Sequence, residues 1–482
     1  MMIGKKLGDL ARGISKPLGR GDSPNLTEPQ SSADVPIRRQ SEIMVSVVIP
    51  VYNSMPYLTE LLNSLERQDL EPERFEVVAV DDGSTDYSGE ILDVYAKRNT
   101  NLRVFHQENS GWPGKPRNVG IEKARGRYVF FVDADDRLGP EALRRMVEFA
   151  QEHAVDLLMP KMVGIDGRRV QTSLFSQTRT EATFEFMLRS LSPQKMIRRE
   201  LLNGAPIRFR EDRVRLEDGM AMVQAYASAK RMSILADYDY YEIRSRADGQ
   251  NISAGTIEPD GYVSSLSEIA RTARAFAHND EDFARRLCAG LFTRKALRFY
   301  EGKRFFRYSV SEQQSWVDSH QKFLDEFVPI NRSKYFSEDR MIVVGLISKG
   351  DLDGLRARAR RQIDQAESPQ VEQVAGDGTR TTFRVKAATG SAVPVQLRIV
   401  DRDTKEITRI DGTFIESTGS FHTSTESAVI AGKIRRLGDV SVHYSDGSSR
   451  RIAAPPEFNE FVGNGVRVYR TVNGFLSVDT RT

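Results

Sequence analysis

The chain has 482 residues, 39% of them hydrophobic and 28% charged, which is typical of a folded protein with more than one domain. Its net charge of +3 argues against a dedicated nucleic-acid-binding protein, because such proteins concentrate basic residues on one face. A single cysteine, Cys288, excludes an internal disulfide framework and indicates a reducing compartment.

Residues 1–43 differ in composition from the rest of the chain and are predicted to form a basic tail and a linker. Within residues 1–20, apolar residues recur at helical spacing with lysines and arginines between them, as in a helix that lies on an anionic membrane surface. Gly4, Gly8 and Gly13 weaken a helix in that stretch, so a disordered tail is the alternative. Residues 21–42 are rich in Ser, Pro, Asp and Gln, and they are predicted to be the linker.

The first folded domain is predicted at residues 44–258, where strands and helices alternate. The apolar run Val45–Val51 is typical of a strand buried on both faces. Further strands are predicted at 75–80, 102–106 and 127–132, and helices at 88–98 and 116–124. Ser84 or Thr85 is predicted to cap the helix at 88–98. This alternation predicts a Rossmann-like α/β fold with a doubly wound, mostly parallel sheet.

Acidic residues directly follow two of these strands. Residues 81–86 read Asp-Asp-Gly-Ser-Thr-Asp, and residues 133–136 read Asp-Ala-Asp-Asp. Strand residues i and i+2 point the same way, so Asp133 and Asp135 should project together from the carboxyl end of the sheet, where such folds bind ligands. Clustered carboxylates repel each other unless a cation lies between them, and Mg²⁺ carrying a diphosphate fits this description. An Asp-rich turn without a ligand is the alternative.

Four motifs occur in an order that resembles one enzyme family. They are Val-Ser-Val-Val-Ile-Pro-Val-Tyr-Asn at 45–53, Val-Asp-Asp-Gly-Ser-Thr-Asp at 80–86, Asn-Ser-Gly and then Arg-Asn-x-Gly within 109–120, and Asp-Ala-Asp-Asp at 133–136. This series resembles the family 2 glycosyltransferases with the GT-A fold. Residues 114–118, 215–218 and 240–244 resemble the subgroup that glycosylates wall teichoic acid, the poly(ribitol phosphate) β-N-acetylglucosaminyltransferases.

The resemblance implies a UDP-sugar donor, a divalent metal (Mn²⁺ or Mg²⁺) and inversion at the anomeric carbon. It also implies a cytoplasmic enzyme that acts on an anionic, lipid-linked cell-wall polymer. The basic amphipathic pattern of residues 1–20 predicts peripheral attachment to the inner face of the membrane.

Individual nucleotide contacts follow from the same resemblance. Pro50 and Tyr52 match residues that flank uracil and stack on it, and Asp82 matches the carboxylate that hydrogen-bonds it. Asn109 and Arg117 match residues at the far side of the nucleotide pocket.

The resemblance also assigns the chemical groups. Asp135 matches the direct metal ligand, and Asp133 matches the carboxylate near the ribose and the metal. Asp218 matches the catalytic base, with Glu217 beside it holding the donor sugar. A helix is predicted to begin at Gly219, so a capping pair is the alternative for the two acidic residues before it.

Further substrate contacts are predicted at one aromatic residue and one aromatic-basic cluster. Trp112 could stack on a sugar or a nucleobase, and a packed loop tryptophan is the alternative. Tyr241, Arg244 and Arg246 are candidates for binding a diphosphate or polymer phosphates, because the fork of Arg fits them. A solvated strand end is the alternative there.

Two further regions follow the catalytic domain. Apolar stripes predict a helical linker or small subdomain at 259–366, and short alternating strands predict a β-sandwich at 372–482. One of these strands is predicted at 427–430, and hairpin turns are predicted at 446–447 and 473–474. By resemblance this domain is immunoglobulin-like and forms a homotrimer, and glycan binding is the alternative.

The predicted function is metal-dependent transfer of a sugar, GlcNAc or a related hexose, to a polyol-phosphate polymer with β linkage. A capsular, exopolysaccharide or secondary-metabolite glycosyltransferase would share the donor-site residues and is an alternative. A non-catalytic polymer-binding scaffold is a second alternative, which a broken metal motif or a missing base would favour. The donor sugar, the acceptor hydroxyl and the choice between Mn²⁺ and Mg²⁺ are left open by the sequence.

Overall fold

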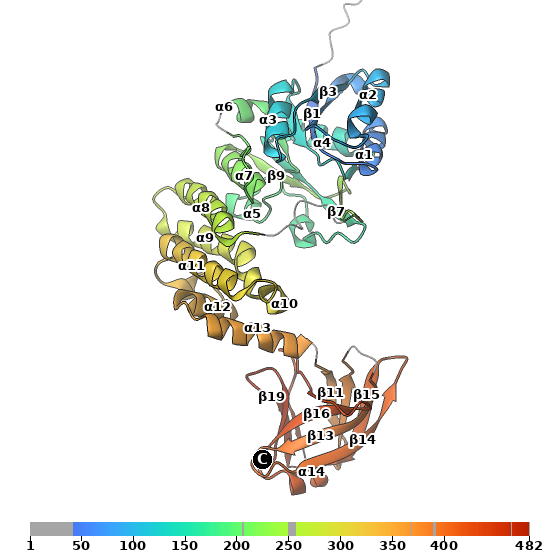
Figure 1. Ribbon diagram of the computed structural model, residues 1–482, viewed down its shortest axis with the longest axis vertical. Coiled ribbons are helices and arrows are strands. Elements are labelled where there is room, and N and C mark those ends of the chain that lie inside the picture. Colours follow the sequence, from blue (N-terminus) through green and yellow to red (C-terminus); the bar gives the residue numbers. More distant parts are fainter. Residues whose placement is uncertain are drawn as a thin grey trace, which may run out of the picture. The chain divides into compact units, whose positions relative to one another are not determined.

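The computed structural model describes residues 42–204, 207–248, 257–366, 368–388, 392–463 and 465–481 (Figure 1). The predicted basic tail and its membrane contact fall in residues 1–41, outside the described part of the chain. Among the described residues, none of the helices has the length and the apolar content needed to span a membrane.

The first sheet has seven strands in the order β3-β2-β1-β4-β8-β6-β9. They are β1 (Val45–Val51), β2 (Phe75–Asp81), β3 (Leu102–His106), β4 (Tyr128–Phe131), β6 (Leu157–Pro160), β8 (Met196–Arg198) and β9 (Met232–Leu235). The first four are parallel neighbours, and β8 lies antiparallel between β4 and β6. Strands β1 and β2 are buried almost throughout, as expected when helices cover both faces. The predicted doubly wound, mostly parallel sheet is confirmed.

Helices connect the strands of this sheet. They are α1 (Tyr57–Glu66), η1 (Pro72–Arg74), α2 (Ser88–Arg98), α3 (Gly114–Lys123), α4 (Ala142–Glu152), η2 (Thr172–Phe175), α5 (Phe184–Met187), α6 (Arg199–Gly204) and α7 (Glu217–Ser228). Helix α3 packs closely on β1, because a Cβ atom at Gly120 would lie 2.2 Å from Val48 Cγ1. The predicted cap of α2 is wrong: Asp86 Oδ1 accepts from the backbone N–H of Ser88, whereas Ser84 and Thr85 bond to Asn53.

A small second sheet lies next to the acidic motif that follows β4. Its strands are β5 (Arg137–Leu138), β10 (Tyr241–Arg244) and β7 (Met162–Ile165), in the order β5-β10-β7. Strand β10 pairs antiparallel with β5, which directly follows residues 133–136. The aromatic-basic cluster of the sequence is thereby held against the acidic motif.

Helices make up the next part of the chain. They are α8 (Pro259–Phe276), α9 (Glu281–Lys295), η4 (Leu297–Tyr300), α10 (Gly302–Phe305), α11 (Val310–Phe327), η5 (Arg332–Lys334), α12 (Glu338–Ser348) and α13 (Leu352–Ala366). Their buried side chains join the core of the first sheet, and Phe299 and Trp316 stack with ring centroids 4.0 Å apart. Helix α11 begins at a capping box formed by Ser309 and Glu312.

The C-terminal part is an antiparallel β-structure with its own core. Its strands are β11 (Gln370–Gly376), β12 (Arg380–Lys386), β13 (Pro394–Asp401), β14 (Ile407–Ile415), β15 (Ser420–Glu426), β16 (Leu437–Tyr444), β17 (Ser449–Arg451), β18 (Phe461–Gly463), β19 (Val466–Arg470) and β20 (Leu476–Asp479). The hairpin turns predicted at 446–447 and 473–474 are confirmed, because β16 pairs antiparallel with β17 and β19 with β20. The predicted all-β sandwich is likewise confirmed.

One predicted C-terminal strand is wrong. Residues 427–430 begin helix α14 (Ser427–Lys433), and the preceding strand ends at Glu426. Ile430 and Ile434 are both buried, and their spacing of four residues places them on one side of a helical turn. The short apolar run therefore belongs to a helical period, which a strand assignment misses.

Candidate active site

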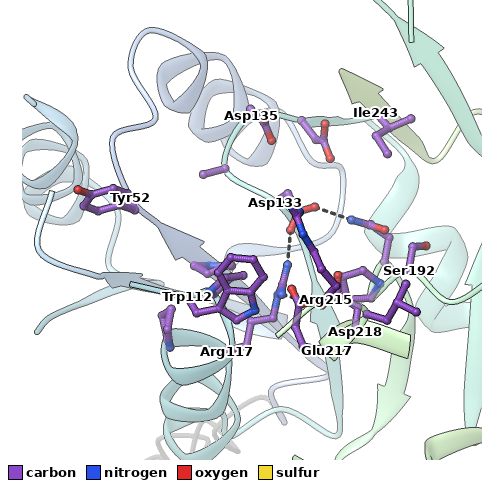
Figure 2. Close-up of a pocket in the computed structure, with 18 of the residues that line it drawn as sticks. Tyr52, Trp112, Arg117, Asp133, Asp135, Ser192, Arg215, Glu217, Asp218 and Ile243 are labelled. Carbon is purple, nitrogen blue, oxygen red and sulfur yellow. Dashed lines mark hydrogen bonds and ion pairs between the residues drawn. The ribbon is translucent and has the colours of Figure 1, made fainter. Parts of the chain in front are cut away.

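A cavity of about 690 Å³ opens at the carboxyl ends of β1, β2 and β4 (Figure 2). Its walls also include the starts of α3 and α7, the loop before β8, the end of β10, and residues of α8, α9 and η4. Every predicted site residue except Tyr241 lines this cavity. Open α/β sheets bind their ligands at this edge.

One end of the cavity is built around Asp82. The buried carboxylate of Asp82 accepts hydrogen bonds from Gln107 Nε2 at 2.5 Å, Ser110 N at 3.1 Å and Ser110 Oγ at 2.8 Å. Asn109 Nδ2 donates to the Asp82 carbonyl at 2.9 Å. Gly83 has φ +70°, and a Cβ atom there would lie 2.7 Å from Asn109 N, so glycine allows the 107–110 loop to close over the end of β2.

Pro50 and Tyr52 complete this end of the cavity at the close of β1. The Tyr52 side chain is 48% exposed, which leaves its ring accessible to a flat ligand. Figure 2 shows Tyr52 at one side of the pocket and Asp218 at the other, with Trp112 and Arg117 between them.

Arg117 joins two acidic segments that are far apart in the sequence. Its Nη2 donates to Asp133 Oδ1 at 2.9 Å, and its Nη1 donates to Asp218 Oδ1 at 2.7 Å. The guanidinium is buried and lies over the Phe209 ring, with Cζ 5.3 Å from the ring centroid. A buried arginine held by two carboxylates is fixed in position, so it fixes the two carboxylates relative to each other.

Hydrogen bonds from β10 hold the Asp-Ala-Asp-Asp motif in place. Tyr241 Oη accepts from Asp133 N at 3.0 Å and donates to Asp136 Oδ2 at 2.6 Å, while Arg244 N donates to Asp136 Oδ1 at 2.8 Å. Burial and the neighbouring Asp133 raise the pKa of Asp136, and the same two causes raise the pKa of Asp135 to about 6. Closely spaced buried carboxylates raise one another's pKa because two negative charges repel in a medium of low dielectric.

The structure divides the aromatic-basic cluster: Arg244 and Arg246 line the cavity, and Tyr241 does not. Tyr241 is fully buried beneath the motif and does not line the cavity. Arg244 uses all three guanidinium nitrogens within the protein, bonding Glu60 at 2.6 Å, Asp166 at 2.7 Å and the Asp135 carbonyl at 3.0 Å. Their direct contacts show both side chains positioning the acidic loop, and the cavity wall includes Arg246, which bonds Asp248 and the Asn53 carbonyl.

The donor set at this loop fits a hard divalent metal. Mg²⁺ and Mn²⁺ take carboxylate oxygens and complete their shells with phosphate and water, so one or two protein ligands are enough. Among the described residues, three His, Cys, Asp or Glu side chains never converge as in an all-protein metal site. Both Asp133 oxygens already accept hydrogen bonds, from Arg117 and from Gln194. Asp135, the predicted direct ligand, lines the cavity beside Asp133, and a cation there would relieve the repulsion between the two carboxylates.

The start of α7 presents the predicted base. Leu216 has φ +63°, which is uncommon for a residue with a side chain, and after it Glu217 and Asp218 form the first turn of the helix. Helix α7 thus begins two residues before the predicted Gly219, and neither acidic residue is its N-cap. The Asp218 side chain is 27% exposed and faces the cavity.

Both carboxyl groups have shifted pKa values. Burial and the charge of Asp218 raise the pKa of Glu217 to about 7. Burial also raises the pKa of Asp218, and Arg117 opposes that rise. A carboxylate that is a stronger base than usual and lies beside a cavity is suited to proton transfer.

Trp112 both lines the cavity and packs in the protein. Its side chain is 8% exposed, and the guanidinium groups of Arg213 and Arg215 each lie 5.9 Å from the centre of its ring. Its buried Nε1 has no hydrogen-bond partner among the described residues. The structure therefore combines the two alternatives that the sequence offers for this residue.

Two residues in the loop before β8 escape sequence reasoning. Gln194 Nε2 donates to Asp133 Oδ2 at 2.6 Å, and Lys195 Nζ donates to Ser190 Oγ at 2.8 Å and to the Ser192 carbonyl at 2.7 Å. Lys195 is fully buried, and burial lowers its pKa to about 7. A lone Gln-Lys pair carries no local signal, because both residue types are usually exposed.

Two family models match the chain. The glycosyl transferase family 2 model matches residues 46–218, and the glycosyl transferase TarS linker domain model matches residues 259–359. The chain is 37% identical over 287 residues to the poly(ribitol-phosphate) beta-N-acetylglucosaminyltransferase TarS of Staphylococcus aureus, covering 58% of this chain and 49% of that protein. It is 33% identical over 326 residues to a poly(ribitol-phosphate) beta-glucosyltransferase of Bacillus spizizenii, covering 66% and 51%. The chain thus spans about half the length of these relatives.

Solved structures give the same fold. The structure of S. aureus TarS 1-349 in complex with UDP-GlcNAc is 30% identical with a TM-score of 0.58, covering 70% of this chain and 96% of that one. The crystal structure of S. aureus TarS is 24% identical with a TM-score of 0.57, covering 90% and 85%, and it supports the fold alone.

Proposed function

Since the chain belongs to glycosyl transferase family 2, we propose that it transfers a sugar from a UDP-sugar to a hydroxyl group of an anionic polyol-phosphate polymer. Both relatives are named for poly(ribitol-phosphate), one as an N-acetylglucosaminyl- and one as a glucosyltransferase. The donor sugar is therefore GlcNAc or a related hexose, and the proposed linkage is β.

The observation that carries the proposal is the double contact of Arg117 with Asp133 and Asp218. Inversion takes a single displacement, in which a base must remove the proton of the attacking hydroxyl while UDP departs. One buried guanidinium ties the carboxylate of the diphosphate end to the carboxylate proposed as the base. This link fixes the geometry that a single displacement requires.

In the proposed reaction Asp218 accepts the proton of the acceptor hydroxyl. The hydroxyl oxygen forms the new bond to the anomeric carbon, and the electron pair of the breaking bond leaves with the β-phosphate of UDP. Burial of Asp218 raises its pKa and so strengthens it as a base. Glu217, with a pKa of about 7, can carry a proton and hydrogen-bond the donor sugar in either direction.

Donor binding is proposed to use the residues at the other end of the cavity. Pro50, Tyr52 and Asp82 are proposed to hold uracil. Asn109 positions Asp82 by donating a hydrogen bond to the backbone carbonyl of Asp82. Asp135, with Asp133 beside it, would hold the divalent metal, which when bound supplies positive charge to the departing diphosphate.

Two cationic side chains of the helical part favour the proposal that the acceptor is anionic. Lys295 and Arg298 line the cavity, and burial together with Arg298 and Arg294 lowers the pKa of Lys295 to about 8. A carboxylate base surrounded by cations suits a substrate that carries a hydroxyl group next to phosphates.

Assembly and location are part of the same proposal. We propose that the C-terminal strands hold the subunits together as a trimer, since that part offers no catalytic constellation among its described residues. We propose that the enzyme works in the cytoplasm. The family resemblance implies both this location and a UDP-sugar donor. Contact of residues 1–20 with the inner face of the membrane stays a prediction on residues outside the described part.

The test is a donor and acceptor screen with the purified chain. UDP-GlcNAc, UDP-glucose and UDP-galactose are each combined with poly(ribitol phosphate), poly(glycerol phosphate) or a neutral polysaccharide, and released UDP is measured. We expect release that depends on a polyol phosphate, with a β linkage seen by NMR. Release only with the neutral polysaccharide would favour the exopolysaccharide alternative, and a lack of transfer with every pair would favour the scaffold.

A further inference from the structure

We propose that four arginines of the helical part, Arg304, Arg307, Arg356 and Arg360, form a basic surface that binds phosphates of the acceptor chain outside the cavity. The inference rests on the proposed function, because it takes the acceptor to be a polyol-phosphate polymer. It gives the enzyme a second contact with the polymer, several repeats away from the hydroxyl group that reacts.

The basic surface begins next to the cavity wall. Arg298 lines the cavity, and its guanidinium lies 5.2 Å from the centre of the Phe299 ring. Arg304 of α10 lies 5.9 Å from the centre of the same ring. Arg298, Arg304 and Arg307 are all close enough to Tyr308 to oppose the rise of its pKa that burial causes. The cations thus follow one another from the cavity along η4 and α10.

Helix α13 extends the basic surface. Phe306 directly follows α10, and the guanidinium groups of Arg356 and Arg360 lie 5.5 Å and 4.7 Å from the centre of its ring. A guanidinium that stacks on an aromatic ring keeps N–H groups at its edge for an oxyanion. Two planar arginines held on one ring therefore present a prepared site for phosphate.

The charges of the basic surface are not balanced within the protein. Across the described residues, none of the four arginines takes part in an ion pair, although Arg356 donates to the Gln313 side chain. Two acidic residues of the adjoining turns have other partners: Glu312 closes the capping box of α11, and Glu301 acts on Arg358. Asp353, three residues before Arg356 on α13, is exposed and forms no ion pair with a described residue.

Unbalanced like charges repel each other, and a protein surface usually intersperses both signs. A polymer with a phosphate in every repeat supplies the missing negative charge and gains affinity by releasing the counterions of both partners. A polymer whose hydroxyl group lies at Asp218 passes Lys295 and Arg298 at the cavity wall, and the basic surface is the next group of cations along that path. This continuity favours the acceptor polymer over an anionic membrane.

The test compares two sets of charge-removing substitutions in the full chain. The first combines Arg304→Gln, Arg307→Gln and Arg360→Gln, all at exposed positions. The matched control combines Lys322→Gln, Arg340→Gln and Lys349→Gln, three exposed cations of the same part that form no ion pair with a described residue. Thermal unfolding checks that both variants fold. Initial rates are measured with a long poly(ribitol phosphate) and with an acceptor of one or two repeats.

We expect the first variant to raise KM for the long polymer by roughly 10-fold, with a weaker salt dependence, because a variant that holds fewer phosphates also releases fewer counterions on binding. Its kcat and its KM for the short acceptor should match those of the wild type and of the control. An unchanged KM for the long polymer would overturn the inference, as would an equal rise in the control. Binding of each variant to phosphatidylglycerol vesicles is measured as well, and a first variant that loses only this binding would also overturn the inference. Lack of transfer to both the long polymer and the short acceptor by the wild type would instead contradict the proposed function.

Discussion

Arg117 Nη1 lies 2.7 Å from Asp218 Oδ1, and this pair ties the start of α3 to the start of α7, 101 residues later in the chain. The same guanidinium contacts Asp133 at 2.9 Å. The residues that would hold the diphosphate and the residue that would take the proton are therefore parts of one ion cluster. Substitutions in this cluster should affect stability and catalysis together.

Arg117→Ala should lower the free energy of unfolding by about 3–5 kcal/mol, because it leaves two largely buried carboxylates without their partner. The matched control is Arg98→Ala, which breaks the exposed pair with Glu66 and should cost less than about 1 kcal/mol. Urea unfolding followed by circular dichroism measures both. If both variants lose the same free energy of unfolding, the buried ion cluster contributes no more to stability than an exposed ion pair.

Glu217→Gln should change how stability depends on pH. Burial raises the pKa of Glu217 from 4.5 to about 7, so between these values the folded protein binds a proton that the unfolded chain has released. This group therefore lowers wild-type stability as pH rises from about 4.5 to about 7, and the variant lacks that loss. The stability difference, variant minus wild type, should grow across this window in urea titrations and level off above pH 7. A difference that stays constant would refute the assignment.

Asp135→Ala should abolish transfer without unfolding the protein, and it should weaken binding of Mn²⁺ in the presence of UDP. The physical reason is that Asp135 lines the cavity and its carboxylate is crowded by that of Asp133, a repulsion that a bound cation relieves. Isothermal titration calorimetry of Mn²⁺ gives a readout besides activity. Asp93→Ala, which removes an exposed carboxylate of α2, is the control. Full activity of the wild type in excess chelator would contradict the metal-dependent mechanism.

Deletion of residues 368–482 should lower the number of subunits per particle, obtained from the molar mass in light scattering, and leave basal hydrolysis of the UDP-sugar largely unchanged. The cut precedes β11, so it removes the C-terminal core as a whole and leaves the core of the first sheet and its helices intact. If the number of subunits per particle stays the same, the C-terminal strands do not assemble the enzyme, and glycan binding becomes the better assignment.

The sequence predicts those parts of the site that are formed by residues next to one another in the chain. Val45–Val51 and the two acidic segments are recognisable because a buried strand followed by carboxylates is a continuous pattern. Tyr241 and Arg244 are predicted as substrate contacts because their types suit phosphates. Their contacts with the acidic loop depend on the pairing of β10 with β5, about 100 residues earlier in the chain, which no local pattern predicts.

Other parts of the site have no local signal at all. Gln194 reaches Asp133 only because β8 lies antiparallel beside β4. Lys295 and Arg298 reach the cavity because α8 packs on α7 and α9 packs on α8, which is a contact between surfaces rather than a motif. The strand predicted at residues 427–430 is wrong for the related reason that a short apolar run fits a strand and a helical turn equally well.

The central claim is that Asp218 removes the proton of the acceptor hydroxyl, and Asp218→Asn tests it most directly. This change removes the basicity with almost no change of volume, and loss of a positioned base should slow transfer by about 10²–10⁴-fold. Calorimetric binding of the UDP-sugar is measured beside turnover with poly(ribitol phosphate). The account predicts that turnover collapses while donor affinity stays within a few-fold of wild type, because Tyr52, Asp82 and Asp135 remain in place. If donor affinity falls as far as turnover, or if turnover persists, Asp218 is not the base.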